Sequence, residues 1–522
     1  METKCDVFRG EDVSFVPKVR SKMPYLEIKP IGKIDRRGPN DEGDPSMPIE
    51  RENLISRDKR LIKPQGTAKA IDTALPDIVT WGARYNSIET GVISPKSFVY
   101  TQDGQIWVLN ELLRTAVSIK AGLNTKAYPK SQLYKTQTQT KMYLVDGKNL
   151  FEYDGNNDNK FTLINLGGVI EPIDVCEHRD RLCLLTNATI VLSANLDPTN
   201  FSSATDSIEI IVGSGKGKNL AWGKLEDKLY IFNTEGIFIL YGDVISALAT
   251  TFEVRLLEER RIIAGRSAVK VEKAIIFLAD DFNIWSWDGS SSQKLSHSEK
   301  LEDYVNTYRQ QLDKAVATYY NNFYMLSFVE KAQTTNNLEI WWCAFEQKID
   351  FVRGRNVSMY MQTDPNIEQK FMLLGRSDTP KIMRADEGYN WDTTAIPVRL
   401  RTRDVTPVPN RNVRFTAFFP KIAPTGTRRI LLQYMLDGRQ SNLTQVVGWY
   451  QSLDGENKIL GEIRIKNQDA VQYRVRPLIG YSKGKSIAFV LIDTTIDLTM
   501  ELRSIVVEYI DRFGKKAEKV GA

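Results

Sequence analysis

From about residue 95 onward, runs of alternating aromatic and β-branched residues repeatedly flank short polar turns. A run, a turn and a second run form the sequence pattern of a β-hairpin. Five hairpins are clear, with turns at residues 102–105, 146–149, 186–189, 233–236 and 279–283. A looser sixth joins Phe323–Phe328 to Leu338–Ala344, and a weak seventh joins Phe371–Leu374 to Lys381–Ala385.

The turn centres recur about every 40 to 50 residues, a period typical of four-stranded propeller blades. One blade cannot bury both of its faces, so neighbouring blades must close into a ring. We therefore expect an all-β protein with a β-propeller of six or seven blades over residues 56–394. The count is open by one because Ile55–Gly82 is able to contribute a closing strand.

After about residue 395 the hydrophobic pattern changes. Strict alternation indicates strands with one buried face, and it occurs at Val398–Arg403, Glu462–Ile465 and Val471–Val475. Longer apolar runs predict central strands, at Ile430–Met435, Ile487–Ile492 and Ile505–Ile510. We expect a separate antiparallel β-sandwich, a platform domain, at residues 395–515, and a charged tail at 516–522.

Residues 1–55 are expected to form an extended N-terminal arm, because frequent prolines block helices and remove ladder donors. Two interpretations stay open: a disordered tail, or an arm that becomes ordered on a neighbouring subunit. The apolar anchors for the second interpretation are Phe15, Val16, Met23, Tyr25, Leu26 and Ile28. Elsewhere one helix is predicted, from a capping Ser298 to about Lys314.

The balance of 70 basic and 65 acidic residues gives a formal charge of +5 over 522 residues. So small an excess of positive charge does not indicate a surface that wraps nucleic acid. The apolar runs fall short of the roughly 18 residues that span a bilayer, and Met1–Asp6 lacks a secretory signal's apolar core. We expect a soluble protein without a membrane span, made in the cytoplasm.

The few cysteines and histidines give little support for a catalytic function. Cys5, Cys176, Cys183 and Cys343 form no CxxC pair, so buried free thiols are expected. His178 lies in a charged turn and His297 in a polar loop, and both are interpreted as solvated loop residues.

Two further motifs are weak. Gly213–Asn219 lacks the first glycine and the final hydroxyl of a phosphate loop, and is expected to connect two blades flexibly. The pairs Glu258-Glu259 and Asp280-Asp281 are adjacent in sequence, which does not place two carboxylates across a cleft. Asp280-Asp281 is expected at a hairpin turn.

Basic residues cluster on predicted strands, where a solvated face is the default and a subunit interface or channel lining is the alternative. The clusters are Arg255–Arg261, Arg399–Arg403, Arg411–Arg414 and Arg428-Arg429. We assign no catalytic, cofactor-binding or metal-binding residue, and we expect a protein that is not an enzyme and has no cofactor.

Four segments, taken in order, carry a resemblance to known proteins: Glu52–Leu54 with Arg60–Thr67, Ile190–Ser202, Gly236–Gly242, and Val269–Leu278 with Trp285–Asp288 and Leu295-Ser296. Together they resemble the tail nozzle (tail hub or tail tubular) proteins of short-tailed bacteriophages. The resemblance covers roughly residues 50 to 300, and the order and spacing of the segments carry it.

The resemblance implies a structural virion protein in a homohexameric ring below the portal and its adaptor. Such a ring builds the DNA channel and retains or releases the genome during ejection. The implied partners are further copies of the chain, portal-adaptor ring proteins, tail fibre or tail needle proteins, and double-stranded viral DNA passing without sequence-specific binding. The implied location is the virion tail, with the host cytoplasm during assembly.

Two alternatives come from other classes. A glycan-binding propeller of a receptor-binding tail component predicts exposed aromatic platforms on one propeller face. A propeller hydrolase predicts convergent carboxylates in the central funnel, for which the sequence offers no candidates.

Overall fold

The structure is a computed structural model of the chain. It describes residues 25–31, 33–36, 44, 46–89, 92–136, 139–155, 160–166, 170–201, 207–242, 244–246, 249–250, 252–296, 299–362, 371–409, 411–422, 428–440, 445–451, 457–459, 464–465, 471–472, 483–495, 498 and 500–511.

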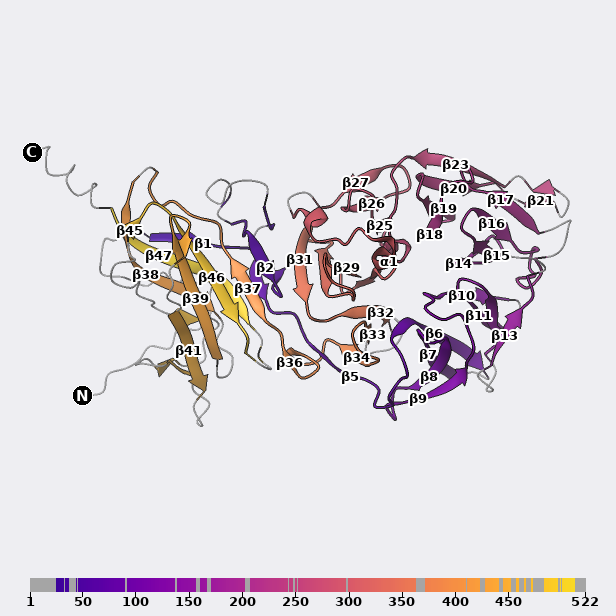
Figure 1. Cartoon of the computed structure of the whole chain (residues 1–522), viewed down its shortest axis with the longest axis horizontal. Coiled ribbons are helices and arrows are strands. Elements are labelled where there is room, and N and C mark those ends of the chain that lie inside the picture. Colours follow the sequence, from indigo (N-terminus) through magenta and orange to yellow (C-terminus); the bar gives the residue numbers. More distant parts are fainter. Residues whose placement is uncertain are drawn as a thin grey trace, which may run out of the picture.

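A β-propeller occupies one end of the molecule (Figure 1). Blade one is β6 (Val79–Glu89), β7 (Val92–Thr101), β8 (Gln105–Asn110) and β9 (Thr115–Lys120). Blade two is β10 (Lys130–Lys135), β11 (Thr140–Val145), β12 (Leu150–Tyr153) and β13 (Phe161–Ile164). The third is β14 (Asp174–His178), β15 (Arg181–Leu185), β16 (Thr189–Leu192) and β17 (Ile208–Ile211).

Blades four to six continue the same antiparallel pattern. Blade four is β18 (Asn219–Leu225), β19 (Lys228–Asn233), β20 (Ile237–Tyr241) and β23 (Glu253–Glu258), with a small hairpin of β21 (Val244–Ser246) and β22 (Ala249–Thr250) between the last two. Blade five is β24 (Val269–Val271), β25 (Ala274–Leu278), β26 (Ile284–Trp287) and β27 (Ser292–Lys294). Blade six is β28 (Val316–Tyr320), β29 (Phe323–Phe328), β30 (Leu338–Cys343) and β31 (Lys348–Arg353).

A composite sheet closes the ring between blade six and blade one. Its strands, in spatial order, are β32 (Val357–Gln362), β33 (Met372–Arg376), β34 (Ile382–Ala385), β5 (Thr67–Lys69), β35 (Asn390-Trp391) and β36 (Thr394-Ala395). The strand expected from Ile55–Gly82 is therefore β5, which pairs with β34. The closing sheet packs against blade one, where Ser358 Oγ donates to the Val79 carbonyl at 2.6 Å.

The hairpins that the sequence predicts are confirmed. All seven pair as second and third strands of a blade or of the closing sheet. Their apolar runs are buried because each blade stacks between two neighbours, so both of its faces exclude water. The β-propeller itself is likewise confirmed, as six regular blades and the closing sheet within the described residues.

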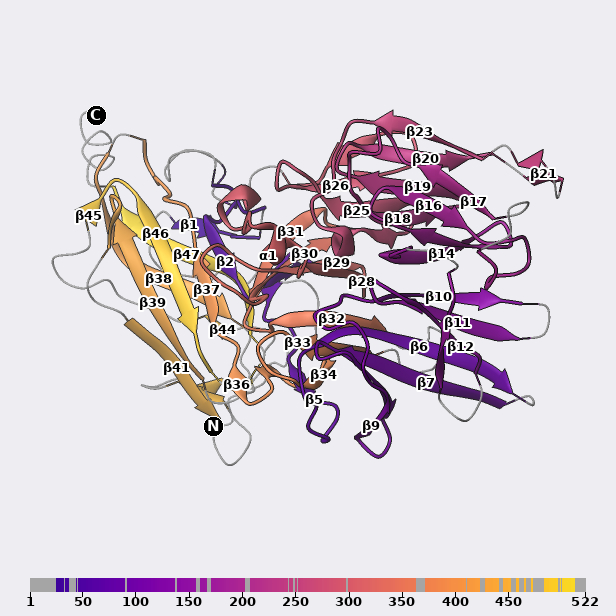
Figure 2. The same ribbon diagram turned by 45° about the vertical axis from the view of Figure 1, so that its right-hand side comes forward.

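The C-terminal strands form two sheets beside the propeller (Figure 2). One contains β3 (Ile55–Arg57), β4 (Arg60–Ile62), β47 (Glu501–Ile510), β38 (Val413–Ile422) and β44 (Val471-Gln472), with β1 (Tyr25–Ile28) and β45 (Lys483-Gly484). The other contains β2 (Glu50–Glu52), β37 (Val398–Arg401), β46 (Ile487–Asp493), β39 (Arg428–Leu436), β40 (Arg439-Gln440), β41 (Gln445–Gln451), β42 (Asn457–Ile459) and β43 (Arg464-Ile465).

One apolar core lies between these two sheets. Phe418 of β38 meets Phe489 of β46 edge-on, with ring centroids 5.0 Å apart. The strands expected to be central are confirmed, since β39, β46 and β47 each have neighbours on both sides. Residues 462–463 and 473–475 of the predicted alternating strands lie outside the described residues.

The expected separation near residue 395 is crossed by one sheet. Strand β2 pairs in parallel with β31, the outer strand of blade six, and antiparallel with β37. Blade six and the second C-terminal sheet are therefore hydrogen-bonded into one twelve-stranded sheet. We call the junction β31–β2–β37 the seam.

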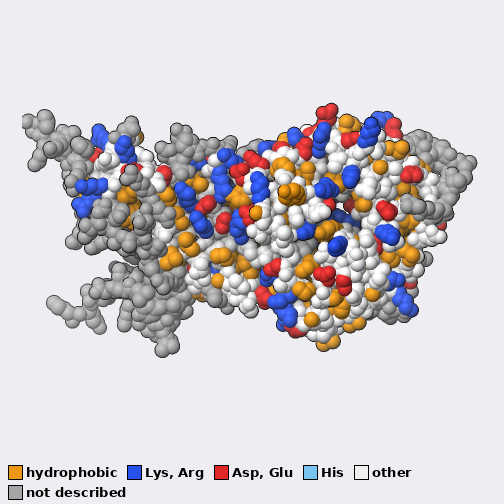
Figure 3. Space-filling model, in the orientation of Figure 1, with side chains coloured by type: hydrophobic (Ala, Val, Ile, Leu, Met, Phe, Trp, Pro, Cys, Tyr) orange, Lys and Arg blue, Asp and Glu red, His pale blue; other side chains and the backbone are white. Residues whose placement is uncertain are grey.

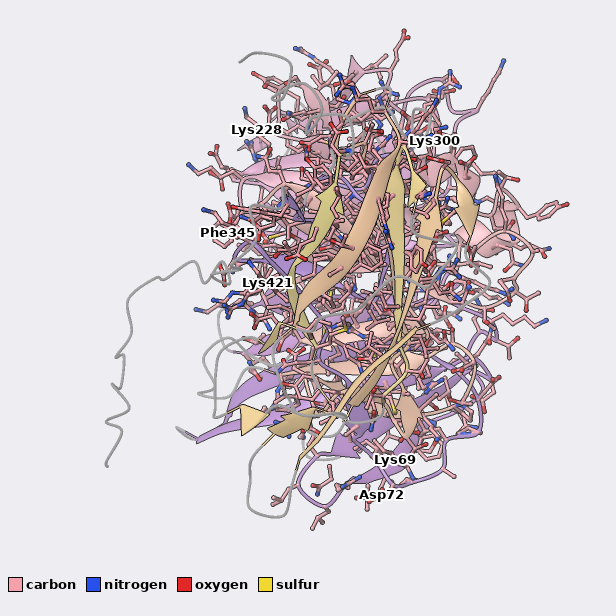
Figure 4. The ribbon with its side chains drawn as sticks, turned by 90° about the vertical axis from the view of Figure 1, so that its left-hand side faces the viewer. Lys69, Asp72, Lys228, Lys300, Phe345 and Lys421 are labelled. Atoms are coloured by element: carbon pink, nitrogen blue, oxygen red, sulfur yellow. The ribbon has the colours of Figure 1, made fainter. Side chains whose placement is uncertain are left out.

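Described residues from the segment 1–55, where an extended arm is expected, pair with strands of the same chain. Strand β1 pairs with β47, with Ile28 opposite Ile505, and Ile28 is fully buried. Lys421, labelled in Figure 4, lies 3.1 Å from the Glu27 carboxylate and ties β1 to β38. Phe15, Val16 and Met23 lie outside the described residues.

The predicted helix from Ser298 to Lys314 is wrong. The segment contains only the 3-10 turn η2 (Leu301–Asp303) and the short α1 (Arg309–Leu312) within its described part. Lys300 has a left-handed φ of +51°, and Val305 forms a β-bridge with Glu330, so the helical backbone cannot continue. Its apolar residues instead fill the core beneath a loop. None of the described helices is long and apolar enough to cross a membrane.

Candidate functional site

The propeller contains a cavity of about 260 Å³ whose wall comes from several sectors of the ring. Its lining includes Thr80, Tyr128, Arg266, Lys314, Asn336 and Ser358. We call it the axial cavity.

The lining residues belong to different blades but to the same end of the ring. Thr80 and Ser358 lie at the starts of the inner strands β6 and β32, and Arg266 and Lys314 lie in segments that lead into β24 and β28. Because strands reverse direction at each turn, the loop between the second and third strands returns to this end, and Asn336 lies in such a loop. The axial cavity therefore lies at one end of the propeller ring. Lys and Arg side chains lie around a recess near the middle of the propeller face in Figure 3.

Arg266 is the charged centre of the wall. It lies in the 3-10 turn η1 (Gly265–Ser267), and its Nη2 donates to the backbone oxygens of Thr80 and Ser358, both at 2.8 Å. Its guanidinium carbon lies 4.7 Å from the centre of the Tyr128 ring. Burial lowers the pKa of Arg266 to about 10, with Tyr128 acting in the opposite direction. Arg266 therefore stays charged at neutral pH and holds together three sectors of the ring.

A hydrogen-bonded frame supports the opposite part of the wall. Lys314 Nζ donates to the Thr334 carbonyl at 2.6 Å. Asn336 Nδ2 donates to the carbonyls of Lys314 and Val357, both at 2.8 Å. Three polar atoms of the cavity residues have no hydrogen-bond partner among the described residues: Arg266 Nη1, Thr80 Oγ1 and Asn336 Oδ1.

The nearby carboxylate is already paired. Asp313 lies 3.0 Å from Arg309, one helical turn earlier. Burial raises the pKa of Asp313, and Arg309 partly offsets this. Burial also lowers the pKa of Lys314. Within the described part of the chain, Arg266 has no ion pair, so the axial cavity carries uncompensated positive charge.

The interpretation of His178 as a solvated loop residue is wrong. It lies on β14 opposite Arg181 and is only 2% exposed. The turn consists of Arg179 and Asp180 alone, both left-handed, so the charged residues mark a tight hairpin rather than a loop. Burial lowers the pKa of His178 to about 4, with Arg179 and Lys224 contributing. His297 lies outside the described residues.

The glycine-rich segment Gly213–Asn219 connects β17 to β18, as predicted. Its backbone does bind a carboxylate, but the carboxylate belongs to the chain. The amide of Ser214 donates to Glu235 at 3.0 Å, and the Ser214 hydroxyl contacts the same group. These hydrogen bonds lower the pKa of Glu235. The segment therefore stabilises the turn between β19 and β20 of blade four, and the Ser214 amide is engaged there rather than with a phosphate.

The carboxylate pairs serve local structure. Glu258 accepts a hydrogen bond of 3.0 Å from the Ser292 amide, which links blades four and five. Asp281 accepts from Trp285 Nε1 at 3.0 Å. The turn position predicted for Asp280-Asp281 is confirmed, since both lie between β25 and β26.

The basic clusters divide between surface and interior. Arg255 is exposed on β23 beside the Tyr241 ring, as a solvated strand face requires. Arg403 differs from that expectation: it is 1% exposed and donates to the Asp35 carbonyl at 2.8 Å. The interface or channel alternative stays a prediction, and the side chains of Arg428 and Arg429 lie outside the described set.

Three cysteines, Cys176, Cys183 and Cys343, are free and buried, as predicted. Cys176 and Cys183 lie opposite each other on β14 and β15, while Cys5 is outside the described residues. In the part of the chain that the structure describes, no group of three or more His, Cys, Asp or Glu residues is placed to hold a metal ion.

Sequence reasoning missed Arg266. It stands between Gly265 and Ser267, outside every charged cluster, and its carbonyl partners at Thr80 and Ser358 are 186 and 92 residues away. No local pattern signals such a site, because only closure of the ring brings these segments together.

No family model matches the chain, and no curated protein matches it. Similar solved structures include the β-propeller domain of Cps50 (Swd1) from Myceliophteria thermophila, at 10% identity over 56% of this chain and 93% of that chain, with a TM-score of 0.35. BamB from Moraxella catarrhalis has 11% identity over 69% of this chain and 97% of that chain, with a TM-score of 0.35. U3-55K has 7% identity over 62% and 99%, with a TM-score of 0.38. These similarities concern the β-propeller fold alone.

Proposed function

We propose that this chain is a structural protein of a bacteriophage virion, forming the tail nozzle ring of a short-tailed phage below the portal and its adaptor. In this role it builds part of the DNA channel and retains or releases the genome during ejection. The ordered series of motifs between about residues 50 and 300 supports the proposal.

The structural observation that supports it best is the seam. A subunit that transmits force along a tail requires its parts to move together, and strands in one sheet cannot hinge without breaking backbone hydrogen bonds. Arg51 of β2 forms a fully buried ion pair with Asp350 of β31. Beside it, Arg353 lies 3.1 Å from Glu52. The seam is therefore held by side chains as well as by backbone.

We further propose that the two C-terminal sheets act as a β-sandwich platform domain that packs against a neighbouring ring. The chain would assemble as a homohexamer, with portal-adaptor ring proteins and tail fibre or tail needle proteins as partners. The small formal charge of +5 suits a channel through which DNA passes, because each neutralised phosphate would add salt-dependent affinity.

The test is electron microscopy of particles assembled while this gene is silenced. DNA-filled or leaky heads that end at the portal and adaptor would support a tail nozzle. Complete tails that fail only to adsorb would contradict it and favour the glycan-binding alternative, which a glycan array would then test. Purified virions that lack the protein, or contain a single copy, would also contradict the proposal.

A further inference from the structure

We propose that the axial cavity binds a small oxyanion, with phosphate in its singly protonated form as the preferred ligand. This inference stands on the geometry of the cavity and does not depend on the proposed function.

The charge of Arg266 favours an anionic ligand. A buried guanidinium without a carboxylate partner is unfavourable, because water has been removed from a charge that nothing neutralises. Arg266 has no ion pair among the described residues, and its Nη1 has no hydrogen-bond partner there. A bound anion would supply both the opposite charge and a hydrogen-bond acceptor for Nη1. Arginine is suited to this because its planar donors match the oxygens of phosphate.

The side chain of Arg266 is also held in a fixed position. Two carbonyl oxygens, those of Thr80 and Ser358, hold Nη2 at 2.8 Å each, and the Tyr128 ring covers the guanidinium. The side chain therefore loses little further rotational freedom when a ligand binds. Such preorganisation distinguishes a binding site from a surface arginine.

The residues that line the cavity combine hydrogen-bond donors with an acceptor. Lys314 uses one hydrogen-bond donor on Thr334, and an ammonium has three. Thr80 Oγ1 is able to donate, and it has no partner among the described residues. Asn336 Oδ1 is an acceptor, since Nδ2 is engaged by two carbonyls. An acceptor beside cationic donors suits an oxyanion that keeps one proton, such as hydrogenphosphate.

The size of the cavity limits the ligand. Its volume of about 260 Å³ lies below the range of roughly 300–1,000 Å³ typical of sites for drug-sized molecules. Phosphate or a small phosphate monoester fits that limit. Sulfate, which carries no proton near neutral pH, would leave Asn336 Oδ1 without a donor and is expected to bind more weakly.

The test is isothermal titration calorimetry of the full chain with sodium phosphate, and with sodium sulfate at equal ionic strength. Saturable binding of phosphate, tighter than that of sulfate, is expected. A 12-base-pair DNA duplex serves as the second source of phosphate groups. Binding of the duplex without binding of free phosphate would overturn the proposal, as would the absence of saturable phosphate binding.

The deciding variant is Thr80→Val, which is expected to fold because it removes a hydroxyl that has no hydrogen-bond partner among the described residues. It is expected to weaken phosphate binding about tenfold or more, the effect of losing one hydrogen bond to a charged group. Thr115→Val, at an exposed position on β9, is the matched control and should bind as the wild type does.

Arg266→Met is expected to abolish binding, provided that its unfolding transition shows that it folds. Should it fail to fold, the comparison of T80V with T115V still decides. Equal phosphate affinity in these two variants would overturn the assignment of the ligand to the axial cavity.

Discussion

His178 shows how burial changes the chemistry of a single side chain. It is one of two histidines, lies on an inner strand of blade three, and has a pKa lowered to about 4, first by burial and then by the positive charges of Arg179 and Lys224. Glu177 and Asp227 act in the opposite direction. The folded chain therefore holds His178 neutral at pH values where an exposed histidine, with a pKa of about 6.5, takes up a proton.

This pKa predicts a pH-dependent stability. Between about pH 6.5 and pH 4 the unfolded chain binds a proton that the folded chain does not, so the free energy of unfolding falls as the pH is lowered. From pH 7 to pH 5 the contribution of His178 to this loss is about 1–2 kcal/mol. Urea unfolding of H178Q at both pH values should show a correspondingly smaller loss than the wild type.

The control is T115V, at an exposed position on β9, which removes no titratable group and should keep the wild-type pH dependence. Identical pH dependence in the wild type and H178Q would contradict the lowered pKa.

At the scale of single elements, β5 determines how the ring closes. It pairs antiparallel with β34 and in parallel with β35, so a strand from the N-terminal part of the chain lies between two strands more than 300 residues later. Gly66, directly before β5, lies so close to Asn390 that an added Cβ would collide with its backbone. Its amide donates to the Gly388 carbonyl at 2.9 Å.

This contact predicts that G66A destabilises the closing sheet. Because the obstacle is backbone rather than a flexible side chain, the expected loss is about 1–3 kcal/mol in the free energy of unfolding. Ala68→Val adds bulk to the same strand at a half-buried position and should change stability by about 0.5 kcal/mol or less. Urea unfolding measures both, and a G66A variant as stable as A68V would show that β5 does not need this close approach.

At the scale of the whole molecule, the seam joins the propeller to the C-terminal sheets. Asp350 is fully buried, and Ser56 as well as Arg51 donates to its carboxylate. Burial raises the pKa of Asp350, and Arg51 opposes that shift. The pair therefore lies where backbone from blade six, from the N-terminal segment and from the C-terminal sheet meets.

Removing one partner of this pair leaves a buried charge without compensation. R51M is expected to lose about 3–5 kcal/mol of stability. K421M removes a partly exposed ion pair with Glu27 and should lose about 1 kcal/mol or less. Guanidinium unfolding compares the two variants, and similar losses in both would contradict the structural role of the seam.

The seam also predicts that the propeller and the C-terminal sheets unfold together. Differential scanning calorimetry of the wild type should give one transition, with a van't Hoff enthalpy close to the calorimetric enthalpy. Two separate transitions would mean that the sheet through β2 does not couple the halves.

Local pattern was enough to predict the hairpins. Phe98–Leu109 and Ile275–Trp287, for example, place alternating or continuous apolar runs around a polar turn, and both fold as the second and third strands of a blade. The same reasoning failed at Ser298–Lys314, where apolar spacing suited a helix but the residues pack as a loop. It failed again at His178, because a two-residue turn and a longer loop contain the same types of charged residue.

The sequence by itself determined the all-β class, the repeated blade unit and the change of pattern near residue 395, because strand alternation and turn chemistry act between near neighbours. Tertiary structure alone decided which strand closes the ring, how β2 joins the two halves, and that Arg266 meets Thr80 and Ser358. These contacts link segments far apart in the chain. Their residues therefore show no shared periodicity, and only the completed ring brings them within hydrogen-bonding distance.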